Sequence, residues 1–217
     1  MTGGGTMPAL VKYEAGEGHV EVREVPEPRC GDDQVKIAVA GTGICGTDLH
    51  VYHGTFRSYP PVIMGHEFAG TVAELGRGVR GVKEGDRVTI LPASAVTCGR
   101  CVHCRSGEFM FCPHRRGMGH GVDGAFAPWT VVRPDQLYRV PAHMGLEEAA
   151  LCEPFAAAVQ PVEEMSGGGC RILVRLLLLL WLLLRLSLGR CRWRRRELGV
   201  DGHGRASDDR HRQRVGR

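Results

Sequence analysis

Residues Thr97–Cys112 read TCGRCVHCRSGEFMFC and place four cysteines at the spacing C-x2-C-x2-C-x7-C. These cysteines are Cys98, Cys101, Cys104 and Cys112. Four thiolates so close together can surround one tetrahedral zinc ion and close its coordination shell, which is the arrangement of a structural zinc site. Two disulfides are the alternative, but pairing cysteines this near in sequence would strain the loop. The spacing therefore predicts a lobe held together by a structural zinc ion.

The composition is typical of a globular protein, with 43% hydrophobic and 24% charged residues among 217. The nine cysteines form no even framework and no secretion signal is evident, so we expect a cytoplasmic protein without structural disulfides. The net charge of +4 conceals a division. Residues 1–174 carry 16 basic and 20 acidic side chains, whereas residues 175–217 carry 12 arginines and 4 acidic side chains. The chain therefore consists of two compositionally different parts.

Short apolar or alternating runs, separated by Gly, Pro and Asp, predict a mainly β fold built as a small, closed or partly closed barrel. The predicted strands are 20–22, 35–39, 70–75, 87–91, 125–132 and 137–140. Helical patterns are predicted only near the end of this region, as one turn over 146–151 and a longer helix over 153–165. Pro161 is expected to kink or interrupt that helix.

Two separated stretches carry reactive side chains. GICGTDLH, residues 43–50, offers Cys45, Thr47, Asp48 and His50 in a glycine-rich loop. His66 and Glu67 follow the apolar run 62–64, and Gly65 could form a turn that lets both face one metal ion. Cys45, His66 and a carboxylate would provide three protein ligands and leave a fourth position open, which is the arrangement of a catalytic zinc site.

Simpler interpretations of these residues remain open. A single Cys or His is more often a core or hydrogen-bonded residue than a ligand. Asp48 could cap a turn, and His50 could be a solvated loop residue. Residues 41–46 also match G-x-G-x-x-G, but no helical pattern or βαβ unit follows, so we interpret this match as coincidental.

Six motifs in order resemble the zinc-dependent medium-chain alcohol dehydrogenase family, most closely its polyol (sorbitol-like) and threonine dehydrogenase branches. They are GICGTDLH (43–50), MGHEFAGTV (64–72), EGDRV (84–88), the four-cysteine stretch, GAFAPWTVV (124–132) and LCEPFAAAVQ (151–160). The resemblance covers residues 9–174. It implies a GroES-like β-barrel domain that holds two Zn2+ ions, one catalytic and one structural, followed by a Rossmann domain that binds NAD(P).

The resemblance also implies roles for single residues. Cys45 and His66 match catalytic zinc ligands, Glu67 matches the carboxylate that ligates in polyol dehydrogenases, and Glu153 matches a residue that touches the zinc-bound water or substrate. Thr47 and His50 match a proton relay that takes the substrate's hydroxyl proton to solvent. The four clustered cysteines match the structural zinc ligands. A small alcohol or polyol is the implied substrate, and a homo-oligomer the implied assembly, although the surface that pairs family members lies largely outside the resemblance.

We therefore expect four segments: a flexible N-terminus (1–8), the zinc-binding catalytic domain (9–152), the helix and first strand of an incomplete Rossmann domain (153–174), and an aberrant tail (175–217). The tail begins RLLLLLWLLLR and contains no glycine-rich dinucleotide fingerprint. Its abrupt Leu and Arg content suggests a reading-frame change in a GC-rich gene. On this hypothesis the NAD(P) site is largely missing and little or no turnover is expected.

The tail has other interpretations. Its nine-residue apolar run, 176–184, is well short of the roughly 20 residues needed to span a membrane. An interfacial or partner-binding helix is the next alternative, and nonspecific nucleic-acid binding by its arginines the last. With such a tail the chain could act as a non-catalytic zinc-binding β-barrel, which is the alternative function. We expect no specific nucleic-acid partner and no membrane insertion.

Overall fold

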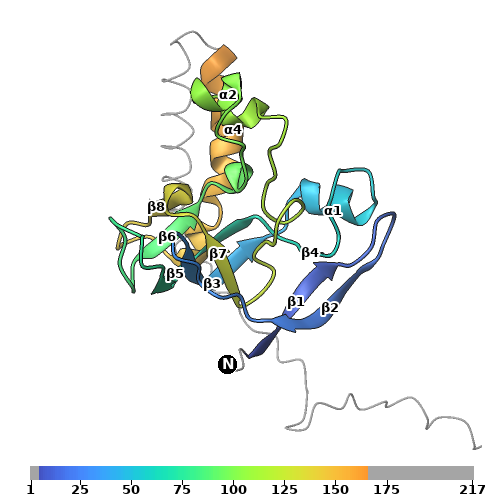
Figure 1. Ribbon diagram of the computed structural model, residues 1–217, viewed down its shortest axis with the longest axis horizontal. Coiled ribbons are helices and arrows are strands. Elements are labelled where there is room, and N and C mark those ends of the chain that lie inside the picture. Colours follow the sequence, from blue (N-terminus) through green and yellow to red (C-terminus); the bar gives the residue numbers. More distant parts are fainter. Residues whose placement is uncertain (1–4, 166–217) are drawn as a thin grey trace, which may run out of the picture. The chain divides into compact units, whose positions relative to one another are not determined.

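The structure is a computed structural model that describes residues 5–165 (Figure 1). The chain divides into two units, 1–166 and 167–217. The expected Rossmann strand near 170–174 and the Leu/Arg-rich tail at 175–217 lie outside the described residues. The fold and the sites below therefore belong to the first unit.

Two antiparallel sheets form the described unit, which confirms the prediction of a mainly β fold. The first has the order β2-β1-β4, with β1 at Thr6–Lys12, β2 at Val20–Pro26 and β4 at Val62–Ile63. The second has the order β7-β3-β5-β6-β8. Its strands are β3 Val35–Gly43, β5 Glu67–Leu75, β6 Arg87–Ile90, β7 Trp129–Val132 and β8 Leu137–Arg139.

The main core lies on the five-stranded sheet. β3 and β5 contribute Val35, Ile37, Phe68 and Val72, all at most 2% exposed. Their pairing contains two register shifts, and such irregularities bend a strand pair. Beyond the second shift, Gly43 lies directly opposite Glu67. The end of β3 is thereby brought against the start of β5, where the predicted reactive residues lie.

Between residues 5 and 165, four α-helices and three 3-10 turns connect or follow the strands. The helices are α1 Gly46–Tyr52, α2 Val102–Arg105, α3 Leu146–Ala149 and α4 Cys152–Met165. The 3-10 turns are η1 Pro92–Ser94, η2 Phe109–Phe111 and η3 Pro134–Gln136. α4 has nearly the predicted bounds, but Pro161 does not end it.

Three local expectations differ from the structure. The N-terminal segment is ordered earlier than predicted, because β1 begins at Thr6 and Met7 is buried. The expected loop over 43–50 contains most of α1. The strand predicted over 125–132 begins only at Trp129, because the amides of Ala125 and Phe126 donate instead to carbonyls of the turn at Met64 and Gly65.

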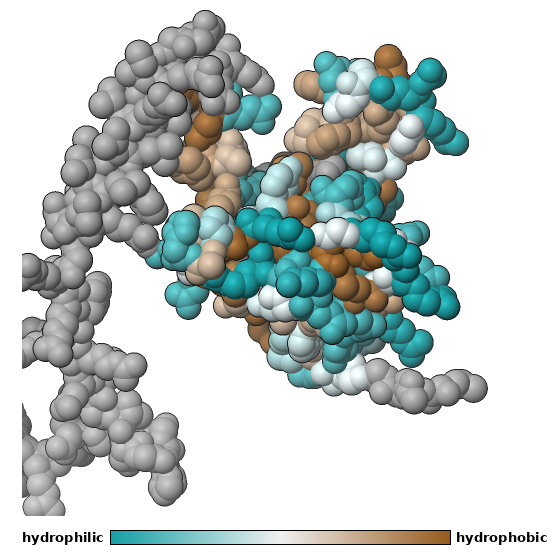
Figure 2. All heavy atoms as spheres, turned by 90° about the vertical axis from the view of Figure 1, so that its left-hand side faces the viewer, coloured by the Kyte–Doolittle hydropathy of each residue, from teal (hydrophilic) through white to brown (hydrophobic). Residues whose placement is uncertain are grey.

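Figure 2 shows one face on which hydrophilic residues predominate and hydrophobic residues are visible in small groups. Large apolar side chains that are exposed include Val102 and Phe111 of the four-cysteine lobe, at 72% and 69%. Across residues 5–165, no helix has the length and apolar character to cross a membrane.

Candidate active site and metal centres

The first candidate ligand, Cys45, lies where β3 ends and α1 begins. Its backbone is extended, so it serves as the N-cap residue of the helix. The Cys45 amide donates to Asp48 Oδ2 at 2.9 Å, and the Asp48 amide donates back to the Cys45 carbonyl at 3.0 Å. This reciprocal contact fixes the turn and with it the position of the thiol.

His66 and Glu67 are held by the turn at Gly65, which has φ +90°. A Cβ at this position would lie 2.6 Å from the Phe126 ring and 2.9 Å from the Phe126 amide nitrogen, so only glycine fits. The turn permits two consecutive side chains to reach one point, which a regular strand would place on opposite faces.

The structure brings Cys45, His66 and Glu67 together. One ligand atom from each lies within 4.8 Å of the other two, and His66 and Glu67 are buried. Gly43 leaves room for the carboxylate, because a Cβ there would lie 2.5 Å from Glu67 Oε2. A thiol, an imidazole and a carboxylate are the ligand types that zinc accepts, so these residues fit a zinc ion.

Asp48 is the functional residue that sequence reasoning interpreted only as a possible cap. Its Oδ1 lies 3.5 Å from His66 Nδ1, an atom that is buried and has no hydrogen bond of ordinary geometry. Burial lowers the pKa of His66, but contacts with Asp48 and Cys45 more than offset this, and the pKa rises from 6.5 to about 9. In the metal-free protein His66 is therefore cationic at neutral pH. The sequence signal that could have indicated this role of Asp48 is its spacing from the candidate ligand, Cys45-x2-Asp48.

Glu153, in the first turn of α4, lies within electrostatic reach of this cluster. Burial raises the pKa of its carboxyl, the His66 imidazole lowers it and the Glu67 carboxylate raises it, with a net upward shift. A half-buried carboxyl whose pKa is raised can hold or release a proton more readily near neutrality than a solvated one.

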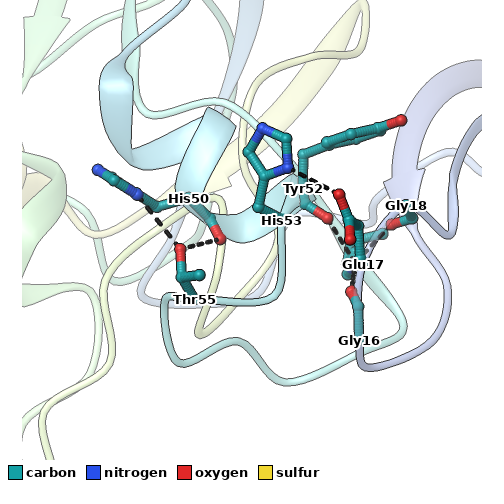
Figure 3. A network of polar contacts seen from close by, with 8 residues as sticks. Gly16, Glu17, Gly18, His50, Tyr52, His53 and Thr55 are labelled. Atoms are coloured by element: carbon teal, nitrogen blue, oxygen red, sulfur yellow. Dashed lines mark hydrogen bonds and ion pairs between the residues drawn. The ribbon is translucent and has the colours of Figure 1, made fainter.

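Thr47 and His50, the predicted relay, both lie on α1. Thr47 is half-buried and His50 is exposed. Figure 3 shows His50 turned toward Thr55, and the two side chains are 3.2 Å apart from Nδ1 to Oγ1. Among residues 5–165, no hydrogen bond connects Thr47 to His50 directly. The helix brings them onto one side, because residues three apart are neighbours on its surface.

Lys12, at the end of β1, was not singled out by the sequence analysis. Its side chain has no exposed surface. Its ammonium donates to the carbonyls of Gly16, Gly18 and Tyr52, the last being the end of α1. The same β1–β2 turn contacts the residue after the helix, because Glu17 Oε1 lies 3.1 Å from His53 Nδ1 (Figure 3). The C-terminal end of α1 is thus fixed to the hairpin.

The four-cysteine lobe presents its thiols to one point. The Sγ atoms of Cys98, Cys101, Cys104 and Cys112 all lie within 4.8 Å of one another. The amides of Cys98, Cys101 and Cys104 donate to cluster sulfurs at 3.4 Å. Cys101 is also the N-cap of α2. Four converging thiols with their own amide donors fit a closed, tetrahedral zinc site.

The thiols of this lobe differ in acidity. Backbone N–H contacts at Arg100 and Cys101 lower the pKa of Cys98 from 9.0 to about 6. Loss of hydration and the neighbouring thiols raise the pKa of Cys104 to about 12. Because a metal ligand must be the thiolate, metal binding to this lobe requires the cysteines to release their protons.

The glycine-rich match at 41–46 is not a dinucleotide site. A helix does follow it, contrary to expectation, but α1 has only seven residues. The strand before it, β3, pairs antiparallel with both β5 and β7. The fingerprint requires a parallel βαβ unit, so the topology supports the interpretation of a coincidental match.

Fold and sites together define a β domain with two side-chain clusters that could each hold a metal ion, one of four thiols and one of a thiol, an imidazole and a carboxylate. The chain belongs to the alcohol dehydrogenase GroES-like domain family, whose model matches residues 31–142. The resemblance and the GroES-like fold inferred from the sequence are thereby confirmed.

Similar proteins support this family assignment. A sorbitol dehydrogenase of Halalkalibacterium halodurans is 44% identical over 74% of this chain and 46% of its own length. An L-threonine 3-dehydrogenase of Pyrococcus horikoshii is 40% identical over 77% of this chain and 49% of its own. A crystal structure described as a zinc-binding dehydrogenase of Sinorhizobium meliloti, bound to NADP, has a TM-score of 0.68 at 38% identity and covers 73% of this chain and 45% of that one. The chain spans about half the length of the curated relatives it matches.

Proposed function

We propose that Cys45, His66 and Glu67 hold a catalytic zinc ion. We further propose that the chain belongs to a dehydrogenase that oxidises a secondary alcohol or polyol with NAD(P). The observation that carries the proposal is the convergence of these three ligand atoms within 4.8 Å. Three protein ligands leave a fourth position for a hydroxyl group. The sorbitol dehydrogenase and the NADP-bound dehydrogenase among the similar proteins support the substrate class and the cofactor class.

Each neighbouring residue has a role in this proposal. A bound zinc ion supplies a Lewis acid that lowers the pKa of a hydroxyl group held against it. Asp48 orients the His66 ring, as carboxylates commonly do behind a ligand histidine. Thr47 accepts the hydroxyl proton, and His50, exposed at the helix surface, releases it to solvent. Glu153 accepts a hydrogen bond from a further hydroxyl of the substrate, which favours polyols over simple alcohols.

We further infer that these 217 residues alone bind little nicotinamide nucleotide. No G-x-G-x-x-G stands after Val174, where the glycine-rich turn that follows the first Rossmann strand is expected. The metal and alcohol sites can be present without a hydride acceptor, so turnover by this chain alone is expected to be low.

Cobalt substitution tests the proposal without relying on turnover. We expect two metal ions per chain, and a change in the visible cobalt spectrum when D-sorbitol is added. His66→Gln should lose the second ion and the spectral change. His114→Gln is the matched control, since His114 lies in neither cluster. A spectrum that no polyol alters, in protein with both sites filled, would contradict the proposal. NADH fluorescence should show little binding.

A further inference from the structure

Two arginine side chains lie on one tyrosine beside the candidate active site. The Cζ atoms of Arg116 and Arg57 lie 4.2 Å and 5.0 Å from the centroid of the Tyr59 ring. The arginines come from separate loops, 53–61 and 113–121, and Arg116 is anchored through two backbone hydrogen bonds with Val96. Cation–π contact therefore holds both guanidinium groups against the same ring.

The two arginine side chains form no ion pair within the described residues. Arg57 and Arg116 are exposed, and within residues 5–165 neither has a carboxylate at ion-pairing distance. Arg23, Arg77 and Arg133, by contrast, each contact an acidic side chain. Guanidinium groups that are positioned and unpaired present N–H donors with the geometry that binds phosphate and carboxylate groups.

His120 connects this pair to the metal cluster. Its carbonyl accepts a hydrogen bond from the Tyr59 amide at 2.8 Å, and its ring contacts Phe56 edge-on at 5.0 Å between centroids. Gly119, the residue before His120, packs directly on the Gly65 turn, because a Cβ on Gly119 would lie 2.9 Å from the Gly65 amide nitrogen. His120 and His66 therefore each follow one of two glycines that are in contact. The His120 Nδ1 atom is buried and has no hydrogen-bond partner.

We propose that the substrate carries an oxyanion at the end remote from the reacting hydroxyl, and that Arg57 and Arg116 bind this oxyanion while His120 contacts the polyol chain between. The inference rests on the proposed function, because it assigns the substrate class of the same site. A polyol phosphate is the ligand that two guanidinium groups suit best, since a phosphate monoester presents three oxygens to a pair of planar donors. A carboxylate substrate shares the same recognition chemistry.

Binding to the cobalt-substituted chain tests the inference by calorimetry and by visible spectroscopy. The probes are D-arabitol, D-arabitol phosphate, L-threonine and inorganic phosphate. The proteins are wild type, Arg57→Gln with Arg116→Gln, and the control Arg23→Gln with Arg77→Gln. The control removes the same charge, and Arg23 contacts Tyr13 at 4.0 Å in the same manner.

We expect the phosphate ester to bind wild type about tenfold or more tightly than D-arabitol, in line with two charge-assisted contacts. The preference should disappear in Arg57→Gln with Arg116→Gln and persist in the control, while D-arabitol alters the cobalt spectrum of all three proteins. If L-threonine rather than the ester shows arginine-dependent binding, the oxyanion is a carboxylate and the proposal stands.

The inference would be overturned if wild type bound ester and polyol equally while L-threonine showed no arginine-dependent binding. A preference for the ester that survives loss of both arginines would also overturn it. So would inorganic phosphate that binds wild type without competing with the ester. Failure of the proposed function has a different signature, namely a cobalt spectrum that no polyol or ester alters in any of the three proteins.

Discussion

Asp48 Oδ1 lies 3.5 Å from His66 Nδ1, and the two side chains are only 4% and 11% exposed. The other oxygen of the same carboxylate accepts a hydrogen bond from the Cys45 amide. One buried acid therefore contacts two of the three candidate ligands, so the positions of Cys45 and His66 are not independent.

Replacing Asp48 by Asn should weaken zinc at the Cys45/His66/Glu67 cluster about 10–100-fold, the usual cost of losing such a contact. The four-cysteine ion should be retained. Competitive chelator titration measures both affinities, and Asp32→Asn, at an exposed ion pair with Arg77, is the control. Unchanged affinity in Asp48→Asn would show that the carboxylate only caps α1.

The raised pKa of His66 predicts how the metal-free protein responds to pH. A group whose folded pKa of about 9 exceeds its unfolded value of 6.5 stabilises the fold fully below pH 6.5 and loses that contribution as pH rises through 9. The shift corresponds to at most about 3 kcal/mol. The difference in unfolding free energy between wild type and His66→Gln should therefore shrink between pH 6.5 and 9.5 in urea titrations. A difference that grows over this range would be inconsistent with a cationic His66.

Zinc binding should have the opposite dependence. The metal requires neutral imidazole, so binding must displace the proton that Asp48 stabilises. We expect the affinity of the second zinc ion to increase as pH rises from 6.5 towards 9, with proton release that calorimetry in buffers of different ionisation enthalpy can count. Asp48→Asn should reduce that release, whereas Asp32→Asn should not change it.

Gly43 and Gly46 form a matched pair for testing the room around Glu67. A Cβ on Gly43 would lie 2.5 Å from Glu67 Oε2, whereas a Cβ on Gly46 would meet nothing within 4 Å. Gly43→Ala should displace the carboxylate and lower zinc affinity about tenfold, with a loss of stability no larger than the roughly 1–3 kcal/mol that is usual for overpacking. Gly46→Ala should leave zinc affinity unchanged. Equal effects of the two substitutions would mean that Glu67 is not a ligand.

Lys12 offers a prediction about stability. Lys12→Met keeps the buried stem but leaves the carbonyls of Gly16 and Gly18 without the Lys12 donor, and Tyr52 keeps only the Gly18 amide, which should cost about 1–3 kcal/mol. Urea unfolding measures the loss, and Lys83→Met, at an exposed position, is the control. Hydrogen exchange should quicken at the Gly18 amide, which donates to Tyr52. Protection unchanged at Gly18 would argue against the proposed fixation of α1.

The sequence identified the candidate ligands because their residue types are unusual together, and the four cysteines because their spacing is specific. It did not predict α1, since that helix has no apolar periodicity: Leu49 is 57% exposed while Val51 is buried. The helix is held by contacts at its two ends, to Asp48 and to Lys12, and the second of these depends on the fold.

β1 was missed for a different reason. Met7, Ala9 and Val11 do alternate with exposed or half-buried residues, but a glycine-rich run precedes them and Pro8 interrupts them. The structure tolerates Pro8 because β4 pairs only with Val11 and Lys12, so the other edge of β1 is open at Pro8. His120 could not be linked to His66 from sequence, because 53 residues separate them and only the fold brings them near.

The turn at Gly65 has one further consequence. Phe126 occupies the space where a side chain at residue 65 would lie. The direction from which His66 and Glu67 enter the cluster therefore depends on Gly65, which has no metal-ligating side chain. A divergent relative could retain cysteine, histidine and glutamate at the ligand positions and still have lost its metal through one exchange at residue 65. Whether a relative has kept the metal site must therefore be judged from the glycine at position 65 as well as from the three ligand residues.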